Sequence, residues 1–175
     1  MALLIQYEGH TTLADILADG LAVLFVGYNP SLLAVERAHY YPRTGNRFWE
    51  DLHEAGLVPR VLRQAGDDLL LPEYGLGVTD VIKRPSPTSD GLTASEYDAG
   101  FARLETLVAR HRPRIVCFNG LGLWQRFRKR GTALPGVEVV AVPSTSPRNN
   151  GLRAERLEAF RRLKALVDAL PPRGM

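Results

Sequence analysis

Short apolar runs alternate along this chain with longer segments of helical periodicity, and this alternation restricts the fold more than any other feature. The runs that predict strands are 21–26, 76–79, 114–118 and 137–142. The segments that predict helices are 12–18, 46–55, 60–65, 95–111, 121–129 and 154–170. Strands separated by helices favour a parallel sheet with helices on both of its faces. The sequence therefore predicts a three-layer α/β/α domain around a central four-stranded parallel sheet.

The composition is that of a globular protein and leaves the partner open. With 175 residues, of which 45% are apolar and 23% charged, the chain is expected to form one domain, 1–175, with a core of its own. A net charge of +3 and a pI near 9.2 are compatible with a polyanionic partner but do not require one.

The turn after the first predicted strand carries a specific polar signal. The strand 21–26 breaks at Gly27, which lets the backbone turn sharply or approach a ligand closely. Pro30 holds Asn29 in extended or turn geometry, at the sheet edge where open α/β sheets bind ligands. The Asn29 amide can orient a water or a base edge, but it cannot titrate. The alternative is a turn asparagine that caps local backbone.

A second polar loop, 143–150, follows the last predicted strand. It contains small hydroxyl residues, one arginine and turn-forming residues. Small side chains let the backbone approach phosphates, and serine and threonine can donate to phosphate oxygens. Arg148 can neutralise a phosphate or enter a groove. The alternative is an ordinary polar turn in which Asn149 or Asn150 caps the next helix.

Other common chemistries find little support in the sequence. The histidines are scattered, and the single cysteine, Cys117, lies in an apolar run that favours a buried structural thiol. There is no glycine-rich dinucleotide fingerprint, no phosphate-binding loop with its lysine, and no nucleophile elbow around a serine. We therefore expect neither a metal nor a cofactor.

Several motifs, taken in order, resemble those of the mismatch-specific uracil-DNA and thymine-DNA glycosylases. They extend from about Thr12 to Phe160, and the ordered set is far more specific than any one motif. The segments that carry the resemblance are Thr12–Leu17, Gly27-Tyr28-Asn29-Pro30-Ser31, Tyr41, Gly45-Asn46-Arg47-Phe48-Trp49, Gly77-Val78-Thr79-Asp80 with Arg84, Pro113-Arg114-Ile115 with Phe118-Asn119-Gly120, and Pro143-Ser144-Thr145-Ser146-Pro147-Arg148. The resemblance implies the uracil-DNA glycosylase-like α/β/α fold.

The resemblance also implies an activity and a site. The activity is that of a monofunctional DNA glycosylase of base excision repair, which flips uracil out of a G·U mismatch and hydrolyses its N-glycosidic bond. Asn29 would place the attacking water and Tyr41 would stack on the base. The other residues implied for the base pocket are Gly27, Tyr28, Ser31 and Asn46. Those implied for DNA contact are Ser144 at a phosphate, and Ser146, Pro147 and Arg148 in the gap left by the flipped base.

Three positions depart from the family pattern. Asp80 stands where the family has lysine or asparagine, and an aspartate can activate the water that Asn29 only orients. The alternative is a loop aspartate that caps local backbone or pairs with Lys83 or Arg84. Ser31 replaces a glycine, and Pro147 replaces an alanine of the thymine-DNA branch. Lys83 is the one lysine left open for Schiff-base chemistry, and nothing indicates that it acts so.

Two other functions stay open at this point. One is a noncatalytic DNA-binding or base-binding relative, and the other is a nucleoside N-ribosyl hydrolase that acts on small substrates. The expected partner is double-stranded DNA carrying a mismatched or damaged base, bound by a monomer. No signal peptide or membrane-spanning segment is evident, so the expected location is the cytoplasm, at the nucleoid if the source is bacterial.

Overall fold

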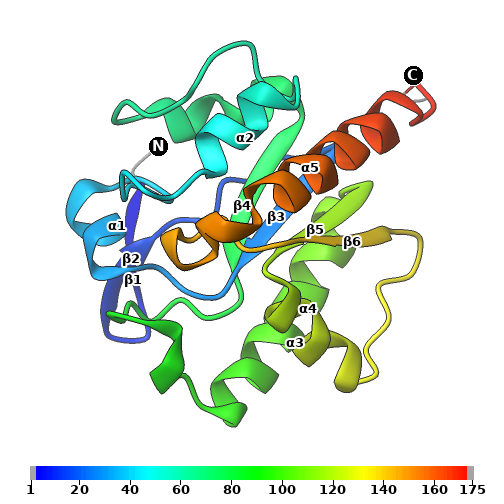
Figure 1. Ribbon diagram of the computed structural model, residues 1–175. Helices are drawn as coiled ribbons and strands as arrows, with labels where there is room; N and C mark the ends of the chain where they lie inside the picture. Colours follow the sequence, from blue (N-terminus) through cyan, green and yellow to red (C-terminus); the bar gives the residue numbers. More distant parts are fainter. Residues whose placement is uncertain (1–2, 173–175) are drawn as a thin grey trace.

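The computed structural model describes residues 3–172 and confirms the α/β/α architecture (Figure 1). The central sheet has four parallel strands in the order β4-β3-β5-β6. Their bounds are β3 Val23–Gly27, β4 Leu76–Asp80, β5 Ile115–Asn119 and β6 Glu138–Val142. The first three are buried along their whole length, which explains why they are almost continuously apolar in sequence.

Helices cover both faces of the sheet. They are α1 Leu32–Arg37, α2 Phe48–Glu54, α3 Ala94–His111, α4 Leu121–Lys129 and α5 Arg153–Asp168, with 3-10 helices η1 Asp67–Tyr74, η2 Ser89–Gly91 and η3 Pro147–Leu152. Alternate residues of β3 enter different halves of the core: Val23 and Phe25 join the half formed with α2 and α5, and Leu24 and Val26 join the half formed with α3 and α4.

Aromatic contacts fix how α2 and α5 pack on the sheet. The Phe25 ring meets the edge of the Phe48 ring at 5.2 Å and stacks on Phe160 at 6.2 Å, measured between centroids. Because α2 leads directly out of the long loop after α1, its packing also positions that loop at the carboxyl edge of the sheet.

The predicted helix 12–18 is wrong. The chain forms a hairpin there, β1 Leu4–Tyr7 with β2 His10–Leu13, and Ile16 then bridges to Val78 of β4. Glu8 and Gly9 take positive φ values and make the turn, and the Thr12 hydroxyl donates to the Lys83 carbonyl at 2.6 Å. These tertiary contacts outweigh the weak helical pattern.

Two further differences lie in the loops. Residues 60–65 are not helical, and the 3-10 helix η1 follows them instead. The sequence reading missed α1, a helix of six residues capped by Ser31, whose hydroxyl accepts from the Ala34 N–H at 3.0 Å. The helices α2, α3, α4 and α5 and the four central strands agree with the predicted ranges to within two residues at either end.

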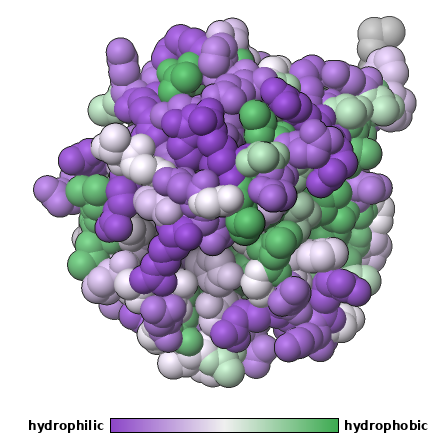
Figure 2. All heavy atoms as spheres, in the orientation of Figure 1, coloured by the Kyte–Doolittle hydropathy of each residue, from purple (hydrophilic) through white to green (hydrophobic). Residues whose placement is uncertain are grey.

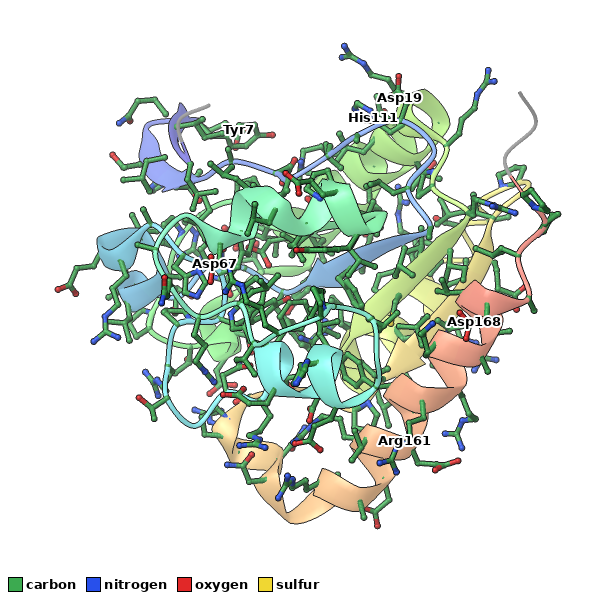
Figure 3. The ribbon with its side chains drawn as sticks, turned by 90° about the horizontal axis from the view of Figure 1, so that it is seen from above. Tyr7, Asp19, Asp67, His111, Arg161 and Asp168 are labelled. Atoms are coloured by element: carbon green, nitrogen blue, oxygen red, sulfur yellow. The ribbon has the colours of Figure 1, made fainter. Side chains whose placement is uncertain are left out.

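Contacts between distant segments close the fold. Asp19, in the segment that enters β3, pairs with His111 at the end of α3, with Oδ1 and Nδ1 2.8 Å apart (Figure 3).

The face seen in Figure 2 is mostly hydrophilic, with apolar residues in small separate groups. Within residues 3–172, no helix has the length and apolar character needed to cross a membrane.

Candidate active site

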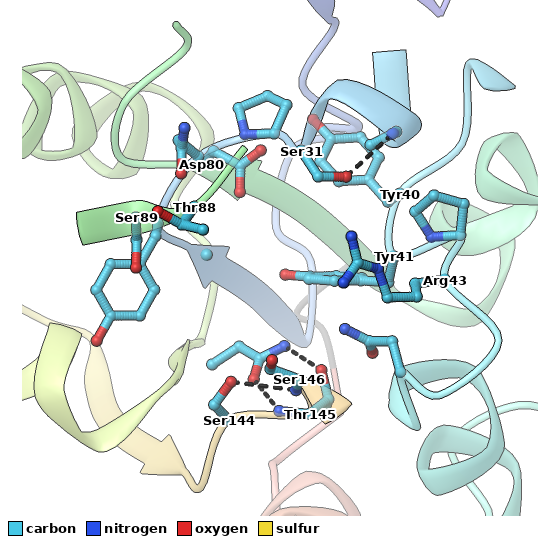
Figure 4. A pocket seen from close by; sticks show the side chains of 18 of the residues that line it. Ser31, Tyr40, Tyr41, Arg43, Asp80, Thr88, Ser89, Ser144, Thr145 and Ser146 are labelled. Atoms are coloured by element: carbon cyan, nitrogen blue, oxygen red, sulfur yellow. Dashed lines mark hydrogen bonds between the residues drawn. The ribbon is translucent and has the colours of Figure 1, made fainter. Parts of the chain in front are cut away.

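A cavity of about 350 Å³ opens at the carboxyl edge of the sheet (Figure 4). Asp80 and the segment 144–146 lie on opposite sides of it, and the hydroxyl end of Tyr41 points into the space between them. The cavity brings together every residue that the sequence assigned to the site: Gly27, Tyr28, Asn29, Ser31, Tyr41, Asn46, Asp80, Ser144, Ser146, Pro147 and Arg148. Four loops far apart in the sequence thus form one site.

Gly27 and Asp80 are partners at the ends of neighbouring parallel strands. A Cβ at Gly27 would lie 2.5 Å from Asp80 Oδ1 and 2.9 Å from the Tyr41 hydroxyl. Both distances are too short for a real side chain, so glycine is what lets the carboxylate and the phenol approach the same point. Asp80 thereby ends β4 with one carboxylate oxygen directed at the floor of the cavity.

The Asp80 carboxyl is buried, and few hydrogen bonds compensate for its removal from water. Its Oδ2 has no hydrogen-bond partner within the described residues. Burial raises the pKa of Asp80 to about 6; Lys83 and Arg103 lower it, and Asp15 raises it. A carboxylate with this pKa can accept a proton near neutral pH.

The alternative that Asp80 pairs with its neighbours in sequence is wrong. Lys83 Nζ instead contacts Asp15 Oδ1 at 2.8 Å, and Arg84 Nε contacts Glu96 Oε1 at 2.6 Å. Lys83 does not line the cavity, so it is also poorly placed for Schiff-base chemistry.

Asn29 is fixed by the loop after β4 and does not cap its own turn. Its Nδ2 donates to the Arg84 carbonyl at 2.9 Å and to Ser86 Oγ at 2.7 Å. The Ser86 hydroxyl in turn donates to the Thr88 carbonyl at 2.5 Å. Both amide hydrogens are therefore used, and Oδ1, which accepts no hydrogen bond within the described part of the chain, is left to receive one from a water.

Tyr41 forms one wall of the cavity in a restrained conformation. Its φ is +51°, unusual for a residue other than glycine, and its ring packs on Phe48 with centroids 4.3 Å apart. Burial, reinforced by the nearby Asp80, raises the pKa of the phenol, and the nearby amide of Asn119 opposes this. The ring is thus a neutral, fixed surface on which a flat base can stack.

The buried side chains of Asp68 and Trp49 hold the backbone of Tyr40, the residue before Tyr41. The Tyr40 N–H donates to Asp68 Oδ2 at 2.8 Å, and the Tyr40 carbonyl accepts from Trp49 Nε1 at 2.9 Å. His39 lies 2.5 Å from Asp68 Oδ1 and stacks on Trp49 with ring centroids 5.0 Å apart. Because these contacts fix the Tyr40 backbone, they also set the direction in which the Tyr41 ring leaves the chain.

The other residues predicted for a base pocket have partners on the protein. Asn46 Oδ1 accepts from the Phe48 N–H at 3.0 Å, and its Nδ2, which has no acceptor within residues 3–172, can donate into the cavity. Tyr28 packs beside Gly120, where a Cβ would lie 3.0 Å from the ring, and Gly120 has a φ of +131°. Ser31 lines the cavity and caps α1 as described above.

Asn119 at the end of β5 holds the polar loop before η3. Its Oδ1 accepts from the Thr145 N–H at 3.0 Å, and its Nδ2 donates to Thr145 Oγ1 at 2.9 Å. Ser144 Oγ accepts from the Ser146 N–H at 3.2 Å, and Ser146 Oγ accepts from the Arg148 N–H at 3.4 Å. Arg148 itself is 68% exposed and lies 3.7 Å from Asp90.

The loop before η3 also packs against the loop before α2. A Cβ at Gly45 would lie 3.0 Å from the Pro147 ring, and the Arg47 N–H donates to the Thr145 carbonyl at 3.1 Å. The proposed DNA-contacting residues are therefore fixed to the segment that carries Asn46.

Sequence reasoning missed three residues that organise the site: Ser86, Asn119 and Thr145. Ser86 lies outside every predicted strand, helix and motif, and Asn119 and Thr145 each stand in a motif without an assigned role. The usable signal was position, because a polar residue that directly follows a buried strand lies at the carboxyl edge of the sheet.

The fold and the cavity define a three-layer α/β/α protein with a cavity at the carboxyl edge of its parallel sheet, lined by carboxylate, amide and aromatic side chains. Within residues 3–172 no group of three or more metal-ligating side chains is present. Residues 14–167 match the Uracil DNA glycosylase superfamily, and the chain belongs to that superfamily.

One solved structure is similar over most of the chain. It is a solution NMR structure of a candidate uracil DNA glycosylase from Methanosarcina acetivorans, 26% identical in sequence, with a TM-score of 0.62. The match covers 87% of this chain and 97% of that one. The shared fold thus extends beyond the sheet to nearly the whole molecule.

Proposed function

We propose that this protein is a monofunctional DNA glycosylase that hydrolyses the N-glycosidic bond of uracil in double-stranded DNA, with G·U mismatches among its substrates. The observation that carries the proposal is the convergence of Asn29 Oδ1, the Asp80 carboxylate and the Tyr41 ring on one cavity. Superfamily membership and the solved neighbour named for the same activity support it.

In the proposed reaction Asn29 and Asp80 act on the same water in different ways. Asn29 Oδ1 accepts a hydrogen bond from the water and orients it, and Asp80 takes the proton as the water attacks. The new bond joins the water oxygen to the sugar C1′. The bond between C1′ and the base nitrogen breaks, and its electron pair leaves with the uracil anion. A proton moves from water to Asp80, so charge and atoms balance.

The base is recognised by stacking and by polar contacts at its edge. The Tyr41 ring supplies the stacking surface, and stacking on an aromatic side chain is commonly worth about 1–3 kcal/mol. The Asn46 amide donates to a pyrimidine carbonyl, and backbone amides near Tyr28 stabilise the negative charge that develops on the departing base.

Contacts with DNA come from the loop before η3 and from its first turn. Ser144 binds a phosphate, and Ser146, Pro147 and Arg148 fill the space that the flipped nucleotide leaves. The fixed position of Pro147 against Gly45 and the exposure of Arg148 suit these roles. Flipping costs a few kcal/mol and is cheapest at a mismatch, which favours G·U over paired uracil.

Single-turnover base release tests the proposal. The substrate is a labelled duplex with one U·G pair, and duplexes with U·A or T·G and single-stranded uracil serve for comparison. We expect release by the wild type, and a collapse of the rate in Asn29→Ala and in Asp80→Asn. An unchanged rate in a folded Asp80→Asn protein would remove Asp80 from the chemistry.

The same assay separates the other two functions. Mismatch binding without release from any substrate would identify a noncatalytic DNA-binding relative. Release from free nucleosides, with no salt-sensitive DNA affinity and no effect of Arg148→Ala, would identify a small-substrate hydrolase. The proposed glycosylase requires the opposite, a DNA affinity that falls with salt and with loss of Arg148.

A further inference from the structure

A charged network lies behind the cavity, against the last two residues of β4. Asp15 Oδ1 accepts from Thr79 Oγ1 at 2.6 Å and from Lys83 Nζ at 2.8 Å, and Asp15 Oδ2 accepts from Arg103 Nη1 at 2.7 Å. Lys83 is 3% exposed. A lysine buried so completely calls for a reason, since removing a charge from water is costly unless the charge is paired.

The network holds the backbone of Asp80 as well as the strand before it. Arg103 Nη2 donates to the Asp80 carbonyl and, at 3.1 Å, to Thr79 Oγ1. Arg103 therefore connects α3 to the end of β4 at Asp80, whose side chain enters the cavity. None of Asp15, Lys83 and Arg103 lines that cavity, so their effect on it passes through Asp80.

We propose that Asp15, Lys83 and Arg103 form a positioning network that fixes the Asp80 carboxylate and sets its charge state for the reaction. The proposal rests on the proposed function for its catalytic consequence. None of the three residues touches substrate; each acts through Asp80.

The balance of charges explains why all three are needed. Two cations, the buried Lys83 and the partly exposed Arg103, favour the ionised Asp80 carboxylate, and one anion, Asp15, opposes it. Burial raises the pKa of Asp15, but Lys83 and Arg103 with their hydrogen bonds outweigh it and hold the pKa low, so Asp15 remains charged. With Lys83 and Arg103 unopposed by Asp15, the pKa of Asp80 would be lower and its carboxylate a weaker base. Without the cations, burial would keep Asp80 protonated.

The groups that face Asp80 from other elements do not change this balance. Burial raises the pKa of both tyrosines nearby, so neither phenol carries charge near neutral pH. The titratable and charged groups around the carboxyl are Asp15 before β3, Tyr40 and Tyr41 after α1, Lys83 after β4, and Arg103 on α3.

The test is the pH dependence of single-turnover base release in Lys83→Met and in Asp15→Asn. Release should rise with pH as Asp80 ionises. Lys83→Met removes a cation and should move this rise up by about one pH unit, and Asp15→Asn removes an anion and should move it down by a similar amount. A purely structural role predicts slower release in both variants with no opposite displacement, and would overturn the proposal.

A second measurement keeps the inference separate from the proposed function. In protein labelled with ¹³C at aspartate carboxyls, the Asp80 signal is identified by its absence in Asp80→Asn, and its titration is followed in each variant. Opposite shifts here with an unmoved rate profile would leave the network established and end the catalytic role of Asp80. If the Asp80 titration is the same in the wild type and in both variants, the network itself is overturned.

A matched control and a conservative variant complete the design. Lys164 pairs with Asp168 at 2.5 Å on the surface of α5, and Lys164→Met should move neither profile. If Lys83→Met unfolds, the isosteric Asp15→Asn still gives the downward shift. Thermal unfolding of each variant confirms that the comparison is made between folded proteins.

Discussion

Gly27 and Asp80 face each other across the ends of β3 and β4. Because Gly27 has no side chain, Asp80 Oδ1 occupies the space that a Cβ at Gly27 would need. The Gly27 carbonyl also accepts from the Val81 N–H at 2.9 Å, so the two strand ends cannot easily separate. The glycine and the carboxylate thus form one structural unit.

Replacing Gly27 by alanine should therefore disable the site. A Cβ at this position would push Asp80 and Tyr41 from their places, and displacements of about 1 Å can cost about a hundredfold in rate. We also expect a loss of about 1–3 kcal/mol in stability from overpacking. Single-turnover release and urea denaturation measure the two effects. Gly91→Ala is the matched control, because nothing lies within 4 Å of a Cβ there. Normal release by Gly27→Ala would contradict this account of the cavity floor.

The raised pKa of Asp80 also has a consequence for stability. Because the pKa is about 6 in the folded protein against an ordinary value of 3.8, the folded state holds the proton more tightly than the unfolded state. Stability should be unaffected below about pH 4 and should fall as pH rises toward 6, by about 3 kcal/mol for a shift of this size.

Asp80→Asn should remove this dependence. The variant is expected to be more stable than the wild type at neutral pH and equal to it below the ordinary aspartate pKa. Urea denaturation at both pH values checks the prediction. Equal stability at both would mean that Asp80 titrates normally. A gain in stability with a loss of base release would mark Asp80 as strained for function.

Much of the fold was accessible from sequence because β3, β4 and β5 are buried on both faces and therefore read as apolar runs. The hairpin β1–β2 was not accessible, since its residues Thr11 and Thr12 follow no clear period and its turn lies at Glu8-Gly9. Its place depends on contacts with the loop after β4, which local sequence does not encode.

The site residues predicted from the sequence all line the cavity, but the contacts that orient them were not predicted. Asn29 was assigned from its motif, whereas the bonds that fix its amide come from Arg84 and Ser86, 55 and 57 residues away. The network of Asp15, Lys83 and Arg103 likewise joins three segments through side chains. Such contacts follow from packing in three dimensions and leave no spacing pattern in the chain.

Ser86 should affect the proposed reaction through the Asn29 side chain that it holds. Ser86→Ala removes one acceptor of the Asn29 amide, so the side chain can rotate and Oδ1 loses its fixed direction. A neutral hydrogen bond is worth about 0.5–1.5 kcal/mol, which corresponds to a loss of about two- to tenfold in the rate of single-turnover release. Mismatch affinity, measured by fluorescence anisotropy, should not change. Ser86→Thr keeps the hydroxyl and should retain most of the rate; a loss in Thr equal to that in Ala would point to packing instead.

The fully buried ion pair between Arg156 and Asp51 should support the loop proposed to contact DNA, separately from its effect on stability. Their side chains are 0% exposed and lie 2.6 Å apart, and Arg156 Nη1 also donates to the Asn149 carbonyl in η3 at 3.3 Å. Asp51→Leu alone leaves a buried, unpaired charge and should cost about 3–5 kcal/mol in urea denaturation.

The double variant Asp51→Leu with Arg156→Met should recover most of that stability, because no charge remains buried. It should nevertheless bind a U·G duplex several-fold more weakly, since η3 has lost its contact at Asn149. Anisotropy titrations measure the affinity, and the exposed pair Arg162–Glu158, 4.0 Å apart, supplies the control: removing it should alter neither quantity. Full affinity in the stable double variant would show that η3 holds its shape without Arg156, and that the pair serves the core alone.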